Sequence, residues 1–294
     1  MNEKAKKRLL YKGSKKMIKE ILKDCVPPIL WRQLIRIKSK NKPYKEVNIP
    51  YFCPTCNHVV KEFHKLSNYF TDMMEKHECI HSIYCYETLN HKKYSCPFCG
   101  ASDRCRLQSI YLNTILNTWQ KEEKECKLLD IAPDKRLADS IKTYKHVRYR
   151  SADLFMEGVD DKIDITDMNI YEDSSFDIIL CSHVLEHIED DRKAMSELFR
   201  ILKPAGFAIV MVPVHMYLTD DFENSEYETE AERWKYFGQN DHVRVYSKNG
   251  FVNKLIQTGF KVNQLGIDYF GEAVFNKSGL SKSSVLYVVE KSQR

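Results

Sequence analysis

The sequence lacks any run of about 18 consecutive apolar residues, so it predicts no membrane-spanning helix. No long apolar stretch with a cleavage site follows the lysine-rich N-terminus, so no secretory signal peptide is expected. Internal repeats and low-complexity tracts are also missing. Because the 10 cysteines have no secretory context, they are expected to be reduced thiols, and the sequence predicts a cytoplasmic protein.

Glycine is scarce, with 10 among 294 residues, and none lies in "KLLDIAPDKRLADSIK" at residues 127–142. This stretch predicts a buried strand that turns directly into a helix. Turns of this kind that hold a nucleotide-like ligand usually carry glycine where the backbone approaches the ligand. The turn alone therefore leaves two alternatives open, an unusual cofactor loop and an ordinary strand–turn–helix.

The net charge of +5 hides an uneven distribution. Residues 1–46 hold 15 Lys/Arg and 4 Asp/Glu, a net charge of +11, so the remainder carries −6. A basic arm on an acidic body predicts a local anionic partner, such as nucleic acid or a membrane surface. Residues 26–40 of this arm place Leu30, Trp31, Leu34, Ile35 and Ile37 along one helical side. That stripe fits peripheral contact with a membrane or packing on the protein's own body.

The chain divides into a basic amphipathic arm (1–46), a cysteine-bearing module with a linker helix (47–118) and a larger domain (119–294). From Lys124 onward, strand-like and helix-like runs alternate, which predicts an α/β domain with a mainly parallel sheet. The connection at 154–161 is too short for a crossover helix. We expect strands at 127–132, 147–153, 162–166, 175–183, 207–214, 260–269 and 284–290, and helices at 103–123, 134–144, 190–202 and 247–258.

Two CxxC pairs bracket one segment: Cys53 with Cys56, and Cys96 with Cys99. Two such pairs can arrange four thiolates tetrahedrally around Zn²⁺, and a closed shell of this kind is structural because no position remains for substrate or water. Unmetallated core cysteines are the alternative. The inserted segment also holds competing ligand candidates, namely His58, His77, Cys79, His81 and Cys85.

Residues 127–214 resemble the class I S-adenosylmethionine-dependent methyltransferases. The resemblance rests on "LLDIAPD", "YRSADLF", and the succession of "SFDIIL", "HVLEHI", a charged amphipathic helix and "LKPAG". It implies a Rossmann-like class I methyltransferase sheet, here with a small zinc-ribbon-like module and a basic helical arm. "CPFCGASDRCRL" (96–107) and "YFGQNDHVRVYS" (236–247) further resemble bacterial methyltransferases associated with polysaccharide biosynthesis.

The resemblance also implies a set of cofactor-binding residues near the carboxyl ends of the strands, where ligands of this fold bind. Asp153 would accept hydrogen bonds from the ribose, Asp164 would meet the adenine amino group, and Ile165 would pack beside the ring. Asp130 and the Ala132–Pro133 turn would face the methionine moiety, with Cys181 and Ser182 on its other side and His183 flanking it. The family's glycine-rich motif is replaced by alanine and proline, which stiffens the turn and removes a donor. We nevertheless expect a cofactor loop.

The acceptor pocket is expected to come from residues 215–246, beyond the fourth and fifth strands. A histidine there could remove the acceptor proton, with a carboxylate orienting it. We favour His242 with Asp241, and then His215, although each could be structural. His187 is expected to be structural. Arg233 and Arg244 are candidates for binding an anionic acceptor.

These features predict a methyltransferase that acts on an oxygen of a glycan or glycan precursor, such as capsule, O-antigen or another surface polysaccharide. Its expected location is cytoplasmic, with residues 1–46 available for contact with the inner face of the membrane. One alternative is an RNA methyltransferase with a zinc recognition module, against which the acidic body and the sequence "CSHV" after the fourth strand argue. Another is a non-catalytic zinc scaffold of a glycan-assembly complex. The sequence does not indicate an oligomeric state.

Overall fold

The computed structural model describes residues 50–292. The basic arm at 1–46, with its amphipathic stretch at 26–40, lies outside the described residues. Across 50–292, none of the helices is both long enough and apolar enough to cross a membrane.

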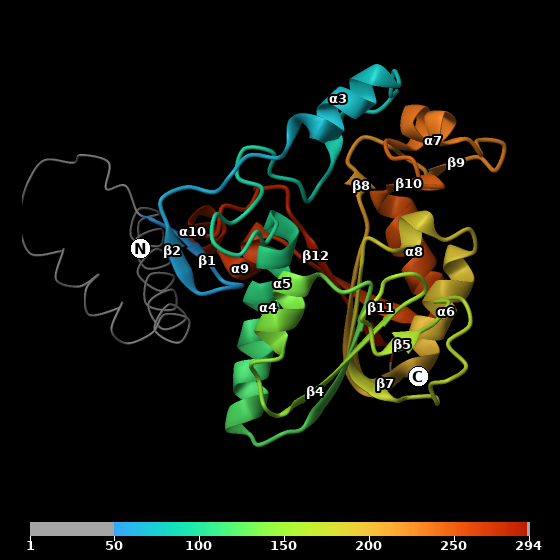
Figure 1. Cartoon of the computed structure of the whole chain (residues 1–294). Helices are drawn as coiled ribbons and strands as arrows, with labels where there is room; N and C mark the ends of the chain where they lie inside the picture. The colour runs from blue at the N-terminus through green and yellow to red at the C-terminus, as the bar shows by residue number, and fades with distance from the viewer. Residues whose placement is uncertain (1–49, 293–294) are drawn as a thin grey trace, which may run out of the picture. The chain divides into compact units, whose positions relative to one another are not determined.

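A seven-stranded sheet forms the centre of the described chain (Figure 1). Its strands are β3 (Cys126–Ile131), β4 (Val147–Asp153), β5 (Asp161–Lys162), β6 (Phe176–Ser182), β7 (Leu202–Met211), β11 (Phe260–Leu265) and β12 (Leu286–Lys291). They pair in the order β11–β12–β7–β6–β3–β4–β5. The pairs from β7 to β5 are parallel, whereas β12 runs antiparallel to both of its neighbours. The predicted Rossmann-like, mostly parallel sheet is confirmed.

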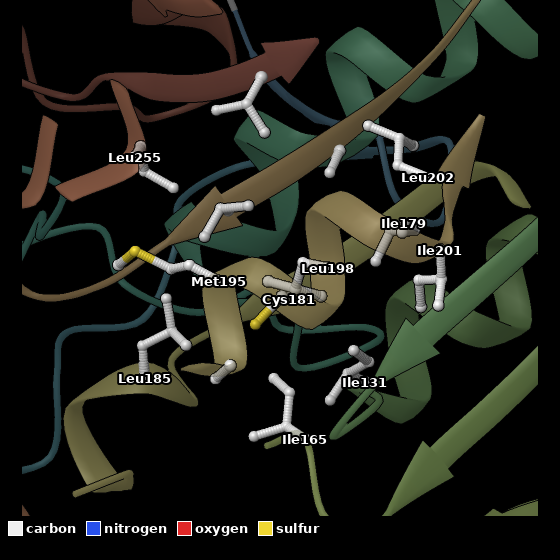
Figure 2. Close-up of a cluster of buried hydrophobic side chains, with 14 of the residues drawn as sticks. Ile131, Ile165, Ile179, Cys181, Leu185, Met195, Leu198, Ile201, Leu202 and Leu255 are labelled. Atoms are coloured by element: carbon white, nitrogen blue, oxygen red, sulfur yellow. The ribbon is translucent and has the colours of Figure 1, made fainter. Parts of the chain in front are cut away.

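Helices cover both faces of this sheet. Figure 1 shows α4 (Asp103–Lys121) and α5 (Lys135–Ile141) on one side, and α6 (Asp191–Ile201) and α8 (Lys248–Thr258) on the other. Successive strand residues point to opposite faces, so β6 needs an unbroken apolar run to bury both. Ile178 packs with α4 and α5, whereas Ile179 belongs to the cluster of α6 and α8, part of which Figure 2 draws.

Helix α8 begins and ends as its sequence predicts. The Ser247 hydroxyl accepts a hydrogen bond from the Gly250 N–H, which satisfies one of the donors left free at a helix start. Gly259 follows the last helical residue with a φ of 109°, a left-handed conformation that glycine adopts without a steric penalty. The prediction of a helix at 247–258 is therefore confirmed.

The expected strand at 162–166 is shorter than predicted. The alternation of buried Ile163 and Ile165 resembles a strand, but only β5 pairs with β4. Asp164 instead closes a tight turn, because its Oδ1 accepts the Thr166 N–H at 2.8 Å. The expected strand at 260–269 likewise ends at Leu265, where α9 (Ile267–Phe270) and α10 (Glu272–Lys277) follow.

The cysteine-bearing module packs against the sheet domain. It contains the hairpin β1 (Tyr51–Cys53) and β2 (His58–Val60), helix α3 (Asn68–Lys76) and the short turn η2 (Ile83–Cys85), and the predicted boundary between residues 118 and 119 lies inside α4. Fully buried Arg106 in α4 donates to the carbonyls of Ala101 (2.9 Å) and Ser278 (2.8 Å). One guanidinium group thus links the second cysteine pair to the C-terminal region.

A small second sheet follows the carboxyl end of β7. It pairs β8 (Val214–His215), β10 (Arg244–Ser247) and β9 (Phe222–Glu223) in that order, and α7 (Glu230–Phe237) precedes β10. The segment after α3 contacts α7, because the Ile80 N–H donates to the Lys235 carbonyl at 2.9 Å and His77 stacks on Trp234. Segments far apart in sequence therefore meet beyond this end of the sheet (Figure 1).

Candidate functional site

The carboxyl ends of three parallel strands lie next to one another. Ile131 at the end of β3 pairs with Ala152 of β4 on one side and with Cys181 of β6 on the other. The chain moves outward from β3 through β4 to β5 and returns to β6 on the opposite side of β3. Such a topological switch point is where ligands bind in open α/β sheets. Asp130 and Asp153 are at the ends of β3 and β4, as predicted.

Asp130 is a buried carboxyl group at the switch point. Only 4% of its surface is exposed, and the Tyr149 hydroxyl donates to its Oδ2 at 2.8 Å. Burial raises the pKa of Asp130 to about 7, although the hydrogen bond from Tyr149 opposes the shift. A cationic ligand group at this position would favour the ionised form.

The turn after β3 keeps the conformation of a glycine turn without a glycine. Ala132 has a φ of 50°, in the left-handed region that costs an L-residue about 1–2 kcal/mol. Its N–H donates to the Ala152 carbonyl at 2.9 Å, and Pro133 has no N–H to offer. The backbone therefore follows the path of a loop that a ligand can approach closely, but it offers that ligand fewer N–H donors.

Asp153 and Asp164 are held in similar local turns. Asp153 Oδ1 accepts the N–H groups of Phe155 (2.7 Å) and Met156 (2.6 Å), and Asp164 Oδ1 accepts that of Thr166. Within residues 50–292, neither Oδ2 accepts a hydrogen bond. Each turn fixes the carboxylate and leaves one oxygen for a ligand donor.

The remaining predicted residues at the strand ends are mostly inside the core. Ile165 and Cys181 belong with Ile131 to one buried apolar cluster (Figure 2). Cys181 is fully buried, and burial raises its pKa, so its thiol is not an available nucleophile. Ser182 Oγ accepts a hydrogen bond from Gln108 Nε2 of α4 at 2.9 Å. The cofactor contacts of these residues stay predictions.

A pocket of about 120 Å³ lies where the cysteine-bearing module, the β7 end and the segment after α7 meet. Its walls are largely apolar, with aromatic side chains that include Phe70 and Tyr86. The polar side chains include Arg104, His183 and His242. His183 is the one predicted cofactor residue that lines it, so this pocket is next to the strand-end carboxylates rather than among them.

Beside this pocket, Glu186 sits among histidines. It is 1% exposed, and neither carboxylate oxygen has a hydrogen-bond partner among residues 50–292. Its Oε1 lies 3.3 Å from His183 Nδ1 and 4.0 Å from His187 Nε2. One ligand atom each from Glu186, His187 and His242 lies within 4.8 Å of the others. Burial raises the pKa of Glu186 to about 7.

The direct contact of Asp241 is with His187, whereas its predicted pairing with His242 stays a prediction. Asp241 Oδ2 lies 3.4 Å from His187 Nδ1, and this bond lowers the pKa of Asp241. Burial opposes charging of His187, but Asp241 and nearby Glu186 raise its pKa. His242 is buried beside His187, and both effects lower its pKa to about 3. A neutral histidine of this pKa is a weak base at neutral pH, which counts against His242 as the base. His187, which was expected to be structural, contacts both Glu186 and Asp241 and so belongs to a polar network.

His215 does not join this group. Its ring lies 5.1 Å from that of His81, and it is absent from the pocket lining. Arg244 is not available to an acceptor either, because it is buried and donates to Glu223 at 2.7 Å and to the Glu189 carbonyl at 2.8 Å. Arg104 is the arginine that lines the pocket; it lies in the segment 96–107 quoted for the resemblance, but it was not predicted as a site residue.

Four cysteines form a compact cluster in the module. Cys53 Sγ lies 3.8 Å from Cys99 Sγ, and Cys56 Sγ lies 3.8 Å from Cys96 Sγ. All four sulfur atoms are within 4.8 Å of one another, and the cluster contains none of the predicted competing ligands. The Ala101 N–H donates to Cys99 Sγ at 3.5 Å. The two predicted pairs are therefore brought together.

Comparison with known protein families gives one match that covers more than half of the chain. A family model described as a methyltransferase domain matches residues 106–265. The match includes all but the first three residues of α4, the strands from β3 through β11, and Glu186, His187 and His242.

Individual relatives are distant. A phosphoethanolamine N-methyltransferase 2 of Caenorhabditis elegans is 33% identical over 97 residues, which are 31% of this chain and 21% of that protein's length. The chain thus spans about a fifth of this relative. An S-adenosylmethionine-dependent methyltransferase structure from Archaeoglobus fulgidus is 12% identical, with a TM-score of 0.37, over 60% of this chain and 92% of that one. A Burkholderia thailandensis 1,6-didemethyltoxoflavin N1-methyltransferase with bound S-adenosylhomocysteine is 12% identical, with a TM-score of 0.38, over 62% and 77%.

Proposed function

The chain belongs to the methyltransferase domain family, and on this premise we propose that it transfers a methyl group from S-adenosylmethionine to an oxygen of a glycan or glycan precursor. The observation that carries the proposal is the row of carboxyl groups at the ends of β3 and β4, on the switch point of the sheet. Bound there, S-adenosylmethionine would supply an electrophilic methyl carbon with the thioether as leaving group, and the proton of the acceptor hydroxyl would pass to water.

The chain's own residues match the parts of this cofactor. Among the described residues, Asp153 has one oxygen that accepts no hydrogen bond, which suits the ribose hydroxyls, and Asp164 has the same arrangement for the adenine amino group. Asp130 can pair with the ammonium of the methionine moiety, which would compensate its buried charge. The turn at Ala132 keeps the path that glycine normally provides.

The acceptor is assigned to the pocket beside His183. Both segments that resemble polysaccharide-associated methyltransferases line it: 96–107 through Arg104, and 236–247 through His242. These segments are more than 120 residues apart in sequence, so their meeting in one pocket supports a shared role in substrate recognition. Arg104 favours an anionic group such as a sugar phosphate or an acidic sugar. A membrane contact by residues 1–46 rests on their net charge and on the apolar stripe within residues 26–40.

Zinc at the four cysteines is part of the same proposal. A tetrahedral ion with Zn–S bonds of about 2.3 Å requires sulfurs about 3.8 Å apart. The Cys53–Cys99 and Cys56–Cys96 separations are both 3.8 Å. The four-thiolate shell is closed, so its role would be to hold the module in place rather than to act on substrate.

Asp153→Asn tests the cofactor site with little change of shape. Asparagine keeps the Oδ1 acceptor for the Phe155 and Met156 N–H groups but replaces the second oxygen by an amide nitrogen. Because a hydrogen bond to a charged group contributes about 1.5–3 kcal/mol, calorimetry should show S-adenosylhomocysteine affinity falling about 10- to 100-fold. Asp167→Asn, an exposed change at the neighbouring turn, is the matched control and should retain affinity. Equal affinity in both variants would remove Asp153 from the site.

The acceptor class is tested by transfer of labelled methyl groups. Purified full-length protein is incubated with labelled S-adenosylmethionine and, in parallel, with the glycan and RNA fractions of the producing cell. We expect label in the glycan fraction, and its loss with Asp153→Asn. Label only in RNA would replace the proposed acceptor while keeping the activity. Cofactor binding without transfer to either fraction would count against the acceptor class alone, and no cofactor binding by zinc-loaded protein would favour a scaffold.

A further inference from the structure

Glu186 is a buried carboxyl group whose hydrogen-bonding capacity is not satisfied by the described residues. Its carboxyl group is 1% exposed, and both oxygens lack hydrogen-bond partners within residues 50–292. Burying a carboxylate without partners costs several kcal/mol in typical proteins. The atoms nearest to Oε1 include imidazole nitrogens of His183 (3.3 Å) and His187 (4.0 Å). Imidazole nitrogens together with a carboxylate are a donor set for a divalent cation.

The orientation of His187 is the second independent observation. Its Nδ1 lies 3.4 Å from Asp241 Oδ2 and 3.3 Å from the Asp241 carbonyl oxygen. A proton on Nδ1 satisfies this contact, so the lone pair of Nε2 is directed toward the Glu186 side. Histidines that ligate metals commonly donate their other N–H to a carboxylate in this way, which fixes the tautomer.

We propose that Glu186, His187 and His242 bind a divalent first-row transition cation, with Mn²⁺ as the test ion. Their ligand atoms lie within 4.8 Å of one another. Ligands of a six-coordinate ion with bonds of about 2.1 Å are about 3.0 Å apart when adjacent and about 4.2 Å apart when opposite, so side-chain shifts of about 1–2 Å bring all three onto one ion. Two imidazoles and one carboxylate are the donor set of Fe²⁺ facial-triad sites, and imidazole ligands favour first-row transition cations over Ca²⁺ and Mg²⁺; Mn²⁺, the weakest binder of that row, is used because it is paramagnetic.

The position of this site indicates a role for the cation in activating the acceptor. Three protein ligands leave coordination positions open, and His242 also lines the pocket assigned to the acceptor. An acceptor oxygen in the pocket can therefore occupy an open position, where the cation lowers the pKa of a hydroxyl group. This role rests on the proposed function, whereas binding of the cation does not.

The site is tested by titrating zinc-loaded full-length protein with Mn²⁺ and following free Mn²⁺ by electron paramagnetic resonance, without cofactor or acceptor. We expect one saturable site that Ca²⁺ and Mg²⁺ compete for weakly. Glu186→Gln should weaken binding at least 100-fold, and Asp241→Asn about 10- to 100-fold because it removes the charge of the carboxylate that His187 contacts. Glu189→Gln is the matched control: the same change, three residues further along the same segment, on a carboxylate that is 72% exposed. It should bind as the wild type does.

Thermal unfolding of each variant shows whether it is folded. If Glu186→Gln fails to fold, His187→Gln replaces it, because His187 is 31% exposed and tolerates the change more easily. Absence of saturable Mn²⁺ binding to folded wild-type protein overturns the proposal. Binding that survives both Glu186→Gln and His187→Gln overturns it too, since the ion would then be elsewhere. Neither result bears on cofactor binding or methyl transfer, which are measured separately.

Discussion

Replacing Cys53 by serine is expected to remove about one equivalent of zinc per chain and to lower the midpoint of thermal unfolding by about 10 °C or more. Serine is not a thiolate, and three sulfurs hold zinc far less well than four. Cys53 Sγ lies 3.8 Å from Cys99 Sγ and is fully buried, so the hydroxyl would also be left in apolar surroundings. Metal analysis and calorimetry of the purified protein measure both effects.

Cys79→Ser provides the control. Cys79 belongs to the same module and is partly buried, but it is not part of the four-sulfur cluster. It should retain zinc, and its midpoint should change by only a few degrees. Cys53→Ser protein that kept a full equivalent of zinc, or that unfolded at the wild-type temperature, would show that the cluster is a set of ordinary core thiols.

Loss of zinc should alter the structure of the acceptor pocket through the hydrogen bonds of Arg106. Its guanidinium donates to the carbonyls of Tyr94 and Ala101, which flank the second cysteine pair, and to Ser278. Tyr94 itself lines the pocket, as does Arg104. A module that loosens at Cys96–Cys99 would therefore displace pocket walls, whereas Asp130 and Asp153 at the strand ends would stay in place. Cofactor affinity should change less than acceptor affinity.

Much of the fold follows from local sequence patterns. The strand predicted at 147–153 coincides with β4, because alternating side chains and Asp153 at its end mark both its type and its limit. The two CxxC pairs were found because each pair is local. The order of the strands depends on long-range pairing, and the sequence analysis predicted a Rossmann-like sheet without specifying that order.

The candidate site was harder to predict because its parts come from distant segments. Glu186 and His187 meet Asp241 and His242 across more than 50 residues, and no local pattern shows which histidine the carboxylate will face. Gln108 reaches Ser182 from α4 for the same reason. The turn at Ala132 was hard to predict for a different reason. Its backbone is left-handed, a conformation that a glycine at this position would have indicated but an alanine does not.

Asp130→Asn is expected to have opposite effects on stability and on cofactor binding. Burial raises the pKa of Asp130 from 3.8 to about 7 in the folded protein, with Asp134 adding to the shift and Tyr149 and Lys142 opposing it. The group therefore favours folding fully below about pH 4, and this contribution is lost as the pH rises through about 7. A shift of this size corresponds to about 4 kcal/mol at pH 9.

Asparagine carries no charge at any of these pH values. Without cofactor, Asp130→Asn should unfold close to the wild-type temperature at pH 5 and several degrees above it at pH 9. The Tyr149 hydroxyl can still donate to the amide oxygen of Asn, so the local hydrogen bond at Oδ2 need not be lost. Thermal unfolding across this pH range, in parallel for both proteins, measures the difference.

The same substitution should weaken S-adenosylmethionine binding about 100-fold, because it removes the charge that pairs with the cofactor's ammonium group. In the wild type, the cofactor should raise the unfolding temperature more at pH 8 than at pH 5, since only the ionised carboxylate makes that pair. A carboxyl group that destabilises the empty protein at high pH is retained only if a ligand compensates it. If Asp130→Asn gained stability at pH 9 yet bound the cofactor as tightly as the wild type, the buried charge would have another purpose, and the assignment of the β3 turn to the methionine moiety would be wrong.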